Sequence, residues 1–217
     1  MVLTLVLLGC TRSASNHEEL GDRSYAAAAY ADALAEYQLG RRANAGSAAL
    51  LAKVAAAAMH TEDYALAAES YRALAQRDRS RADSLLFVYG MTLARVRDCS
   101  TAVRVFEGVV RRQRAPVVVE AAREGLGLCA LVEGQMALEQ GRADEAEGWF
   151  RRATAPGASP DVVRGAFLGL GDVRLKQGDL PGAMESYQQA LAGGTPGDTI
   201  SQRAQEKLNS LGKAEPE

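Results

Sequence analysis

Several residue types are scarce in this chain of 217 residues, and each scarcity removes a class of function. Only two histidines and three cysteines are present, and the cysteine spacing matches no zinc or redox motif. The 25 Lys and Arg residues are balanced by 27 Asp and Glu, so the positive field typical of nucleic-acid binding is missing. Aromatic residues make up only 6% of the chain, which disfavours a sheet-rich protein. The composition favours an all-α protein without a metal or nucleic-acid partner.

The residues that catalysis would need form no recognisable arrangement. His17 and His60 have no nearby ligand set or catalytic partner in the sequence, so both are expected to be solvated. The Gly-Leu-Gly segments at 125–127 and 169–171 follow no predicted strand, so we expect them to serve helix packing rather than phosphate binding. We therefore expect no enzyme activity, no cofactor, no metal site and no small-molecule substrate.

What the sequence does contain is a repeat with a period of about 34 residues. A small residue followed four positions later by an aromatic ring occurs five times, and the copies are 34, 35, 44 and 37 residues apart. A second small residue lies about 12 positions before each of these alanines. The alanines are Ala33, Ala67, Ala102, Ala146 and Ala183, and the second set is Gly21, Ala55, Gly90, Gly134 and Gly171.

This pattern resembles the tetratricopeptide repeat family, in which Leu-Gly marks the first helix of each hairpin and Ala with an aromatic marks the second. The clearest copy has Leu170-Gly171, then Ala183 and Tyr187. The resemblance implies an all-α, right-handed superhelical solenoid of about five helical hairpins over residues 14–197. The expected repeats are 14–47, 48–81, 83–116, 117–160 and 161–197.

Two departures from the period carry predictions of their own. The 44-residue interval predicts a lengthened first helix in repeat four, from near Val117 to about Leu138, because no turn signal interrupts it. After the break at Gly193-Gly194, apolar residues at helical spacing predict a capping helix at 198–212 that covers the open face of repeat five. Residues 213–217 are expected to form a disordered tail.

Residues 1–10 are an apolar run that ends in Leu7-Leu8-Gly9-Cys10 and is too short to span a bilayer. These four residues resemble the lipobox of bacterial lipoproteins, in which the cysteine is lipidated. The resemblance implies a lipid anchor at Cys10 on the periplasmic face of a Gram-negative outer membrane. No Lys or Arg precedes the run, so we interpret it as a truncated signal segment. The alternative is an unmodified Cys10 and a soluble, co-chaperone-like adaptor in the periplasm or cytoplasm.

The other two cysteines, Cys99 and Cys129, have two possible states. Free cysteine is often buried as a small hydrophobe, which favours two thiols. An oxidising periplasm would permit a disulfide instead.

In the tetratricopeptide repeat family, the first helices line an inner face that receives a peptide or a helix. Transferred to this sequence, that face is mostly apolar and lacks the basic clamp with which one subclass grips acidic C-terminal peptides; Leu131 fits the core equally well. The resemblance implies a scaffold that binds an apolar peptide or amphipathic helix of another protein and supports assembly of an envelope complex. The predicted groove residues are Tyr25, Met59, Phe87, Met91, Arg95, Leu128, Leu131, Gln135, Leu168, Asp172 and Leu175.

Overall fold

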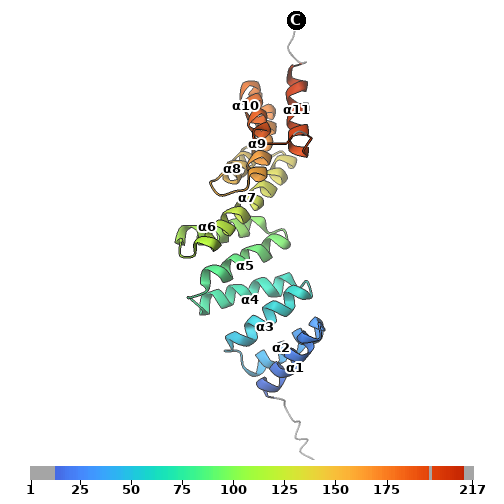
Figure 1. The fold of residues 1–217 in the computed structure, drawn as a ribbon, viewed down its shortest axis with the longest axis vertical. Helices are drawn as coiled ribbons and strands as arrows, with labels where there is room; N and C mark the ends of the chain where they lie inside the picture. Colours follow the sequence, from blue (N-terminus) through green and yellow to red (C-terminus); the bar gives the residue numbers. More distant parts are fainter. Residues whose placement is uncertain (1–12, 196, 213–217) are drawn as a thin grey trace, which may run out of the picture. The chain divides into compact units, whose positions relative to one another are not determined.

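The computed structural model describes residues 13–195 and 197–212, and all regular structure in these residues is α-helical (Figure 1). The prediction of an all-α fold is therefore confirmed. The apolar run at 1–10, with Cys10, and the tail at 213–217 lie outside the described residues.

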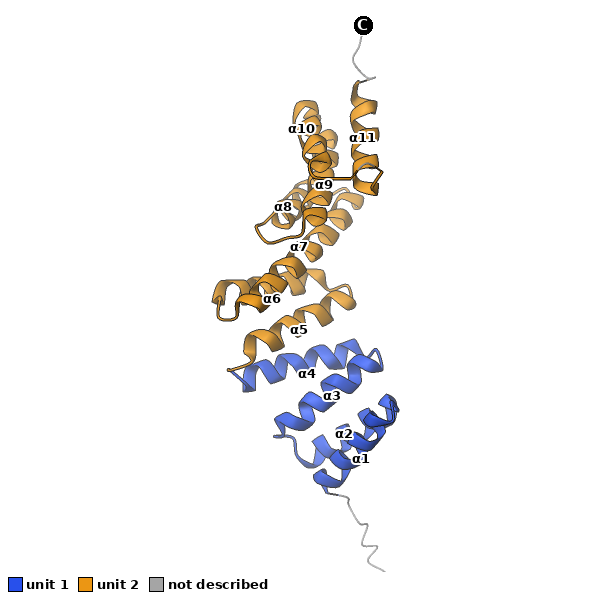
Figure 2. Cartoon of the chain, viewed as in Figure 1, with its two compact units in different colours: residues 1–79 blue, residues 80–217 orange. Residues whose placement is uncertain are grey.

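The chain divides into two compact units, residues 1–79 and 80–217, with the boundary near the end of the predicted second repeat (Figure 2). The first unit contains α1 (Ala14–Ala26), α2 (Tyr30–Ala43), α3 (Ala48–His60) and α4 (Tyr64–Arg77). The second contains α5 (Ala82–Arg95), α6 (Cys99–Arg112), α7 (Pro116–Glu139), α8 (Ala143–Ala153), α9 (Pro160–Lys176), α10 (Leu180–Leu191) and α11 (Thr199–Gly212).

Small residues allow the paired helices to approach closely. Consecutive helices form hairpins, α1 with α2 and α3 with α4 in the first unit, and α5 with α6, α7 with α8 and α9 with α10 in the second. A β-carbon added at Gly90 of α5 would lie 2.6 Å from the ring of Phe106 on α6. At Gly134 of α7 it would lie 2.6 Å from Phe150 on α8. The repeated small residues thus mark the sites where an aromatic ring packs against a bare backbone.

The turns inside all five hairpins share one backbone feature. Two positions before each second helix stands a residue in the left-handed region, with φ between 58° and 82°. Only the last two turns use glycine there, so the sequence signals only those two as sharp turns. The residues are Ala28, Glu62, Arg97, Gly141 and Gly178.

Helix α7 has 24 residues and corresponds to the lengthened helix that the sequence predicts. It begins at Pro116, a residue suited to a first helical position because no N–H is needed there. Its middle packs on α6, since a β-carbon at Gly125 would lie 2.8 Å from Phe106. Its C-terminal half packs on α8 through Gly134. One long helix therefore serves two hairpins.

Helix α11 packs as the first helix of a further repeat would. Ala204 is buried in a cluster with Tyr187 of α10, and Leu208 and Leu211 pack against that cluster. In the first unit, α3 packs on α2 and Tyr37 through residues at the same spacing, namely Leu50, Val54 and Ala57.

A second correspondence supports the same conclusion. Lys207 of α11 lies 2.7 Å from a carboxylate oxygen of Asp172, which also accepts a hydrogen bond of 2.8 Å from the Tyr187 hydroxyl. In the first unit, Lys53, Asp22 and Tyr37 form the same trio, and Lys53 again stands three residues after the first of the packed positions. The capping helix at 198–212 is thus half of a sixth repeat.

Candidate functional site

In the first unit, the inner face formed by α1 and α3 contains a hollow of about 340 Å³. Tyr25, one of the predicted groove residues, lines it, and Met59 is half-buried one turn beyond Ala56 on α3. The alanines leave the space open because they carry no long side chain. The lining residues are Asp22, Tyr25, Tyr37, Ala52, Lys53 and Ala56.

The charged groups at this hollow are paired with one another, one ammonium between two carboxylates. The Lys53 ammonium lies 2.8 Å from Glu18 and 2.7 Å from Asp22, and the Tyr37 hydroxyl donates to Asp22 over 2.9 Å. Burial opposes the charge on Asp22, but the hydrogen bonds from Lys53 and Tyr37 outweigh it and lower the pKa of this carboxyl. Burial and the bond to Asp22 raise the pKa of Tyr37. The hollow therefore offers a ligand mainly apolar contact.

The two histidines have structural contacts. The His60 side chain is exposed, but its ring stacks on Tyr30 with centroids 4.0 Å apart, and Tyr25 lies edge-on to both rings. The prediction that His17 is solvated is wrong. Its side chain is 14% exposed, and its Nδ1 lies 2.7 Å from Glu36 because α1 and α2 pack face to face.

In the second unit, α5 carries three of the predicted groove residues. Met91 is 41% exposed and Arg95 is also exposed. Phe87 is half-buried, with its ring centroid 6.0 Å from that of Phe106, so it contributes to packing as well. Since Phe106 lies against both α5 and α7, these two helices lie side by side.

Helix α7 has the longest row of exposed apolar side chains in the described residues. Leu128, Val132 and Met136 are 47%, 41% and 38% exposed, and their spacing of four places them on one helix face. Only Leu128 is among the predicted groove residues. Of the others predicted on α7, Gln135 is exposed, whereas Leu131 is half-buried and its side chain would lie 3.2 Å from a β-carbon at Gly165 of α9. We call Leu128, Val132 and Met136 the α7 stripe.

The length of α7 explains why the stripe is uncovered. The first residue of α6, Cys99, touches Cys129, so the α6 helix reaches no further along α7 than this point. Met136 holds the position that Ala57 holds on α3, where the preceding helix α2 buries it completely. Val132 and Met136 lie beyond the N-terminus of α6, so no preceding helix buries them. The sequence feature that could have predicted these exposed residues is the 44-residue interval, which lengthens α7.

In repeat five, the predicted groove residues do not line an open groove, because α11, which the sequence predicts to cover this repeat, packs over them. Leu168 is 4% exposed and belongs to the core beneath α11. Asp172 pairs with Lys207, and Leu175 packs against the same core cluster. The inner surface of this repeat is therefore filled by a segment of the chain itself.

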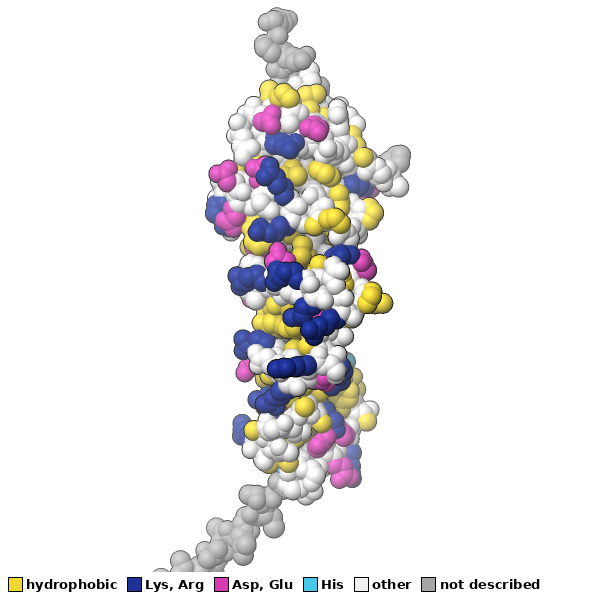
Figure 3. All heavy atoms as spheres, turned by 90° about the vertical axis from the view of Figure 1, so that its left-hand side faces the viewer, with side chains coloured by type: hydrophobic (Ala, Val, Ile, Leu, Met, Phe, Trp, Pro, Cys, Tyr) yellow, Lys and Arg dark blue, Asp and Glu magenta, His cyan; other side chains and the backbone are white. Residues whose placement is uncertain are grey.

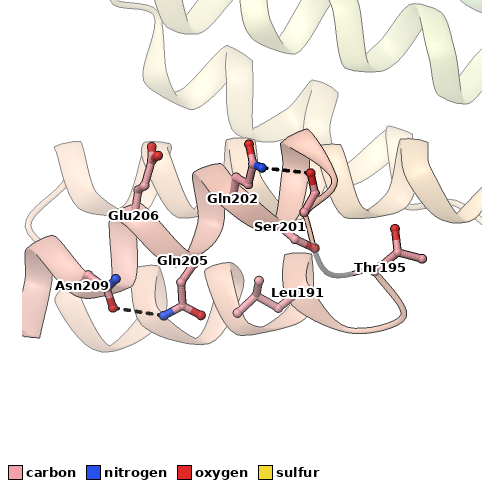
Figure 4. Close-up of a pocket in the computed structure, with 9 residues that line it drawn as sticks. Leu191, Thr195, Ser201, Gln202, Gln205, Glu206 and Asn209 are labelled. Atoms are coloured by element: carbon pink, nitrogen blue, oxygen red, sulfur yellow. Dashed lines mark hydrogen bonds between the residues drawn. The ribbon is translucent and has the colours of Figure 1, made fainter.

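The outward side of α11 borders a hollow of about 520 Å³ (Figure 4). Apart from Leu191, the side chains that line it are polar, and two of them form hydrogen bonds within the helix or to the preceding loop. Gln202 donates to the backbone oxygen of Gly197 over 2.9 Å, and Gln205 donates to Asn209 over 3.0 Å. This surface resembles a finished end of an array rather than an apolar binding site.

Arginines end the second helix of each of the first four hairpins, and Figure 3 shows one face with many Lys and Arg side chains among hydrophobic ones. Cations are favoured at helix C-termini because the exposed carbonyls there are negative. Arg112, in the last turn of α6, also bonds the buried carboxylate of Asp83 at 2.6 Å. These arginines therefore have a structural explanation.

Comparison with known families decides the assignment. The tetratricopeptide repeat profile matches residues 89–162 and 159–199, which together span 111 of the 217 residues. The chain belongs to the tetratricopeptide repeat (TPR) family. TPR proteins are generally non-enzymatic scaffolds, and their folds bind protein or peptide partners. No curated protein matches the chain.

Solved TPR structures share the fold over most of their length. A TPR repeats protein from Bacteroides fragilis NCTC 9343 is 13% identical with a TM-score of 0.58, covering 91% of this chain and 98% of its own. YrrB is 17% identical with a TM-score of 0.52, covering 89% and 92%. MamA is 17% identical with a TM-score of 0.50, covering 94% and 96%. At these identities the likeness concerns the fold alone. Among the described residues, no helix has the length and apolar character needed to cross a membrane.

Proposed function

We propose that this TPR protein is an interaction scaffold that binds an apolar face of a helical segment from another protein. The observation that carries the proposal is the α7 stripe, three apolar side chains in a row that are each about two fifths exposed. Contiguous exposed apolar side chains generally mark interaction sites, and methionine adapts to varied partners. A helix with apolar residues at i, i+4 and i+7 presents a matching surface.

Two further observations support this use. Met91 on helix α5, which contacts α7, is also 41% exposed, so a second first helix of this unit presents an apolar side chain to solvent. YrrB, which shares the fold, is described as a TPR protein with an unusual peptide-binding site. We propose that this chain binds a peptide segment as well.

A displayed library of amphipathic helical peptides tests the proposal directly. The Met136→Asp variant places a charge in the α7 stripe, and Met184→Asp is the matched control, since Met184 of α10 is 42% exposed against 38% for Met136. We expect the wild type and the control to enrich the same apolar peptides, with affinity falling at least about tenfold, ~1.4 kcal/mol, in Met136→Asp. Circular dichroism would verify that both variants fold.

Equal binding by both variants would contradict the assignment of the site to α7. Enrichment of acidic peptides only would contradict the apolar character of the partner.

We also propose that the scaffold is lipid-anchored through Cys10 in the periplasm and supports assembly of an envelope complex. The support is the Leu7-Leu8-Gly9-Cys10 sequence. Expression behind a complete signal sequence in a Gram-negative host fed labelled palmitate should label the wild type and leave Cys10→Ser unlabelled. An unlabelled wild type would favour the soluble adaptor instead.

A further inference from the structure

Two buried cysteines from different repeats touch in the second unit. Cys99 is the first residue of α6 and Cys129 lies in the middle of α7; they are 5% and 3% exposed. Their Sγ atoms are 2.7 Å apart and share a hydrogen bond, although the residues are 30 positions apart in sequence. Both are free thiols in the structure.

This placement brings the two sulfur atoms close to bonding distance. Bonded sulfurs lie about 2.05 Å apart, so the two Sγ atoms need to approach by only roughly 0.7 Å. The contact joins the second helix of repeat three to the first helix of repeat four, which also pack together through Phe106 and Gly125. A covalent bond here would hold the two helices in the register that they already adopt.

The two thiols are not equivalent. The hydrogen bond within the pair lowers the pKa of Cys99 and raises the pKa of Cys129. Cys99 also stands at the N-terminus of α6, where the helix dipole favours an anion. It follows the turn that contains Arg97 in the left-handed region. Opening of this first helical turn would expose the Cys99 sulfur while α7 stays packed.

Burial as small hydrophobes explains why each cysteine lies inside the protein, but it does not explain the pairing. Buried cysteines surrounded by carbon are inert, whereas here the neighbour of each sulfur is another sulfur. Among the described residues, these are the only cysteines.

We propose that Cys99 and Cys129 form a disulfide that staples repeat three to repeat four when a disulfide-bearing oxidant is present. The Cys99 thiolate attacks one sulfur of the oxidant's disulfide, breaks that S–S bond and expels the first thiolate. Cys129, having given its proton to solvent, attacks the Cys99 sulfur and expels the second thiolate. The protein loses two electrons and two protons, and the oxidant becomes two thiols.

The disulfide would lie at the N-terminus of α6, the furthest point that α6 reaches along α7, immediately before Val132 and Met136 of the α7 stripe. The disulfide would fix α7 at Cys129 and would leave Val132 and Met136 exposed. The proposal concerns the state of the two sulfurs and is independent of whether the stripe binds a partner.

The experiment uses the full chain with Cys10→Ser, so that the pair is the only source of thiols. The protein is incubated with oxidised glutathione or with dithiothreitol, and intact mass and thermal unfolding are measured. We expect the oxidised protein to lose the mass of two hydrogens, to form no disulfide-linked dimers and to melt at a higher temperature than the reduced protein. Dithiothreitol should reverse the mass loss and the rise in melting temperature.

Two variants make the test specific. With Cys129→Ala, the reaction should stop at a glutathione adduct on Cys99, because the resolving thiol is missing. With Cys99→Ala, neither the mass loss nor the rise in melting temperature should occur. The proposal is overturned if both thiols of the oxidised protein alkylate on unfolding, if disulfide-linked dimers form instead, or if either variant shows the same rise.

Discussion

Single residues decide how tightly each hairpin closes. The small residues that recur about 12 positions apart in the sequence correctly predicted where the two helices of a hairpin touch. An aromatic ring can pack against the backbone there only if no larger side chain is in the way. The hairpin turns were harder to predict, since Ala28, Glu62 and Arg97 adopt the left-handed conformation with side chains that ordinarily avoid it. Only the fold shows that three non-glycine residues occupy a glycine position.

Replacing Arg97 with glycine should therefore stabilise the protein by about 1 kcal/mol, because a β-carbon is unfavourable at φ 62°. The reciprocal variant Gly178→Ala should destabilise it by a similar amount, since an added β-carbon there meets nothing within 4 Å and only the backbone is affected. Urea unfolding of both variants measures the two changes. An Arg97→Gly variant no more stable than the wild type would show that the Arg97 side chain makes a compensating contact.

At the scale of the helices, α7 and α11 determine which apolar side chains of the second unit are exposed. Both departures from the 34-residue period were visible in the sequence, α7 as a long interval and α11 as a late apolar pattern. Their consequences were not visible. Because α7 extends beyond α6, Val132 and Met136 are exposed, whereas α11 buries the surface around Leu168. Matching the sequence to the repeat pattern of the family identifies the equivalent positions, but it cannot show which neighbouring helix covers each of them.

One buried arginine contributes to the attachment of α11, beside the apolar cluster around Ala204. Arg164 of α9 is 5% exposed and donates to both carboxylate oxygens of Asp198 at 3.0 Å, to the Ser201 hydroxyl at 2.8 Å and to the Ala190 carbonyl at 2.9 Å. The Ser201 N–H and the Arg164 guanidinium hold the pKa of Asp198 well below its usual 3.8. Loss of this carboxylate charge should release the start of the helix.

Amide hydrogen exchange over 199–212 measures that release. Asp198→Asn should exchange severalfold faster, whereas Asp161→Asn should change little, because Asp161 contacts the same arginine with its side chain 81% exposed. Since the folded pKa of Asp198 is depressed, its contribution is complete at neutral pH and is lost as the pH falls below 3.8 toward the folded pKa. Equal rates of amide exchange in both variants would show that the Asp198–Arg164 contact does not hold the start of α11.

At the scale of the molecule, each unit contains a core of its own. The cluster around Tyr37 lies entirely within residues 1–79, and the cluster around Tyr187 lies entirely within residues 80–217. In repeat proteins, stability is approximately a sum over neighbouring repeats, so no single core has to hold the whole chain.

We therefore expect the isolated 80–217 fragment to fold, giving a helical circular dichroism spectrum and a cooperative thermal transition. The 1–79 fragment should be less stable, because small units bury a smaller share of their surface. An unstructured 80–217 fragment would contradict the independence of its core.

The polar outer side of α11 has a consequence for polymerisation. In α3, Leu51 and Ala55 are buried by the following helix α4, whereas the corresponding positions on α11 are Gln205 and Asn209, which bond each other. A second copy that tried to continue the stack would have to dehydrate these amides without an apolar gain in return. The two amides should therefore disfavour growth of a filament through this surface, and converting them to leucine and alanine should remove this penalty.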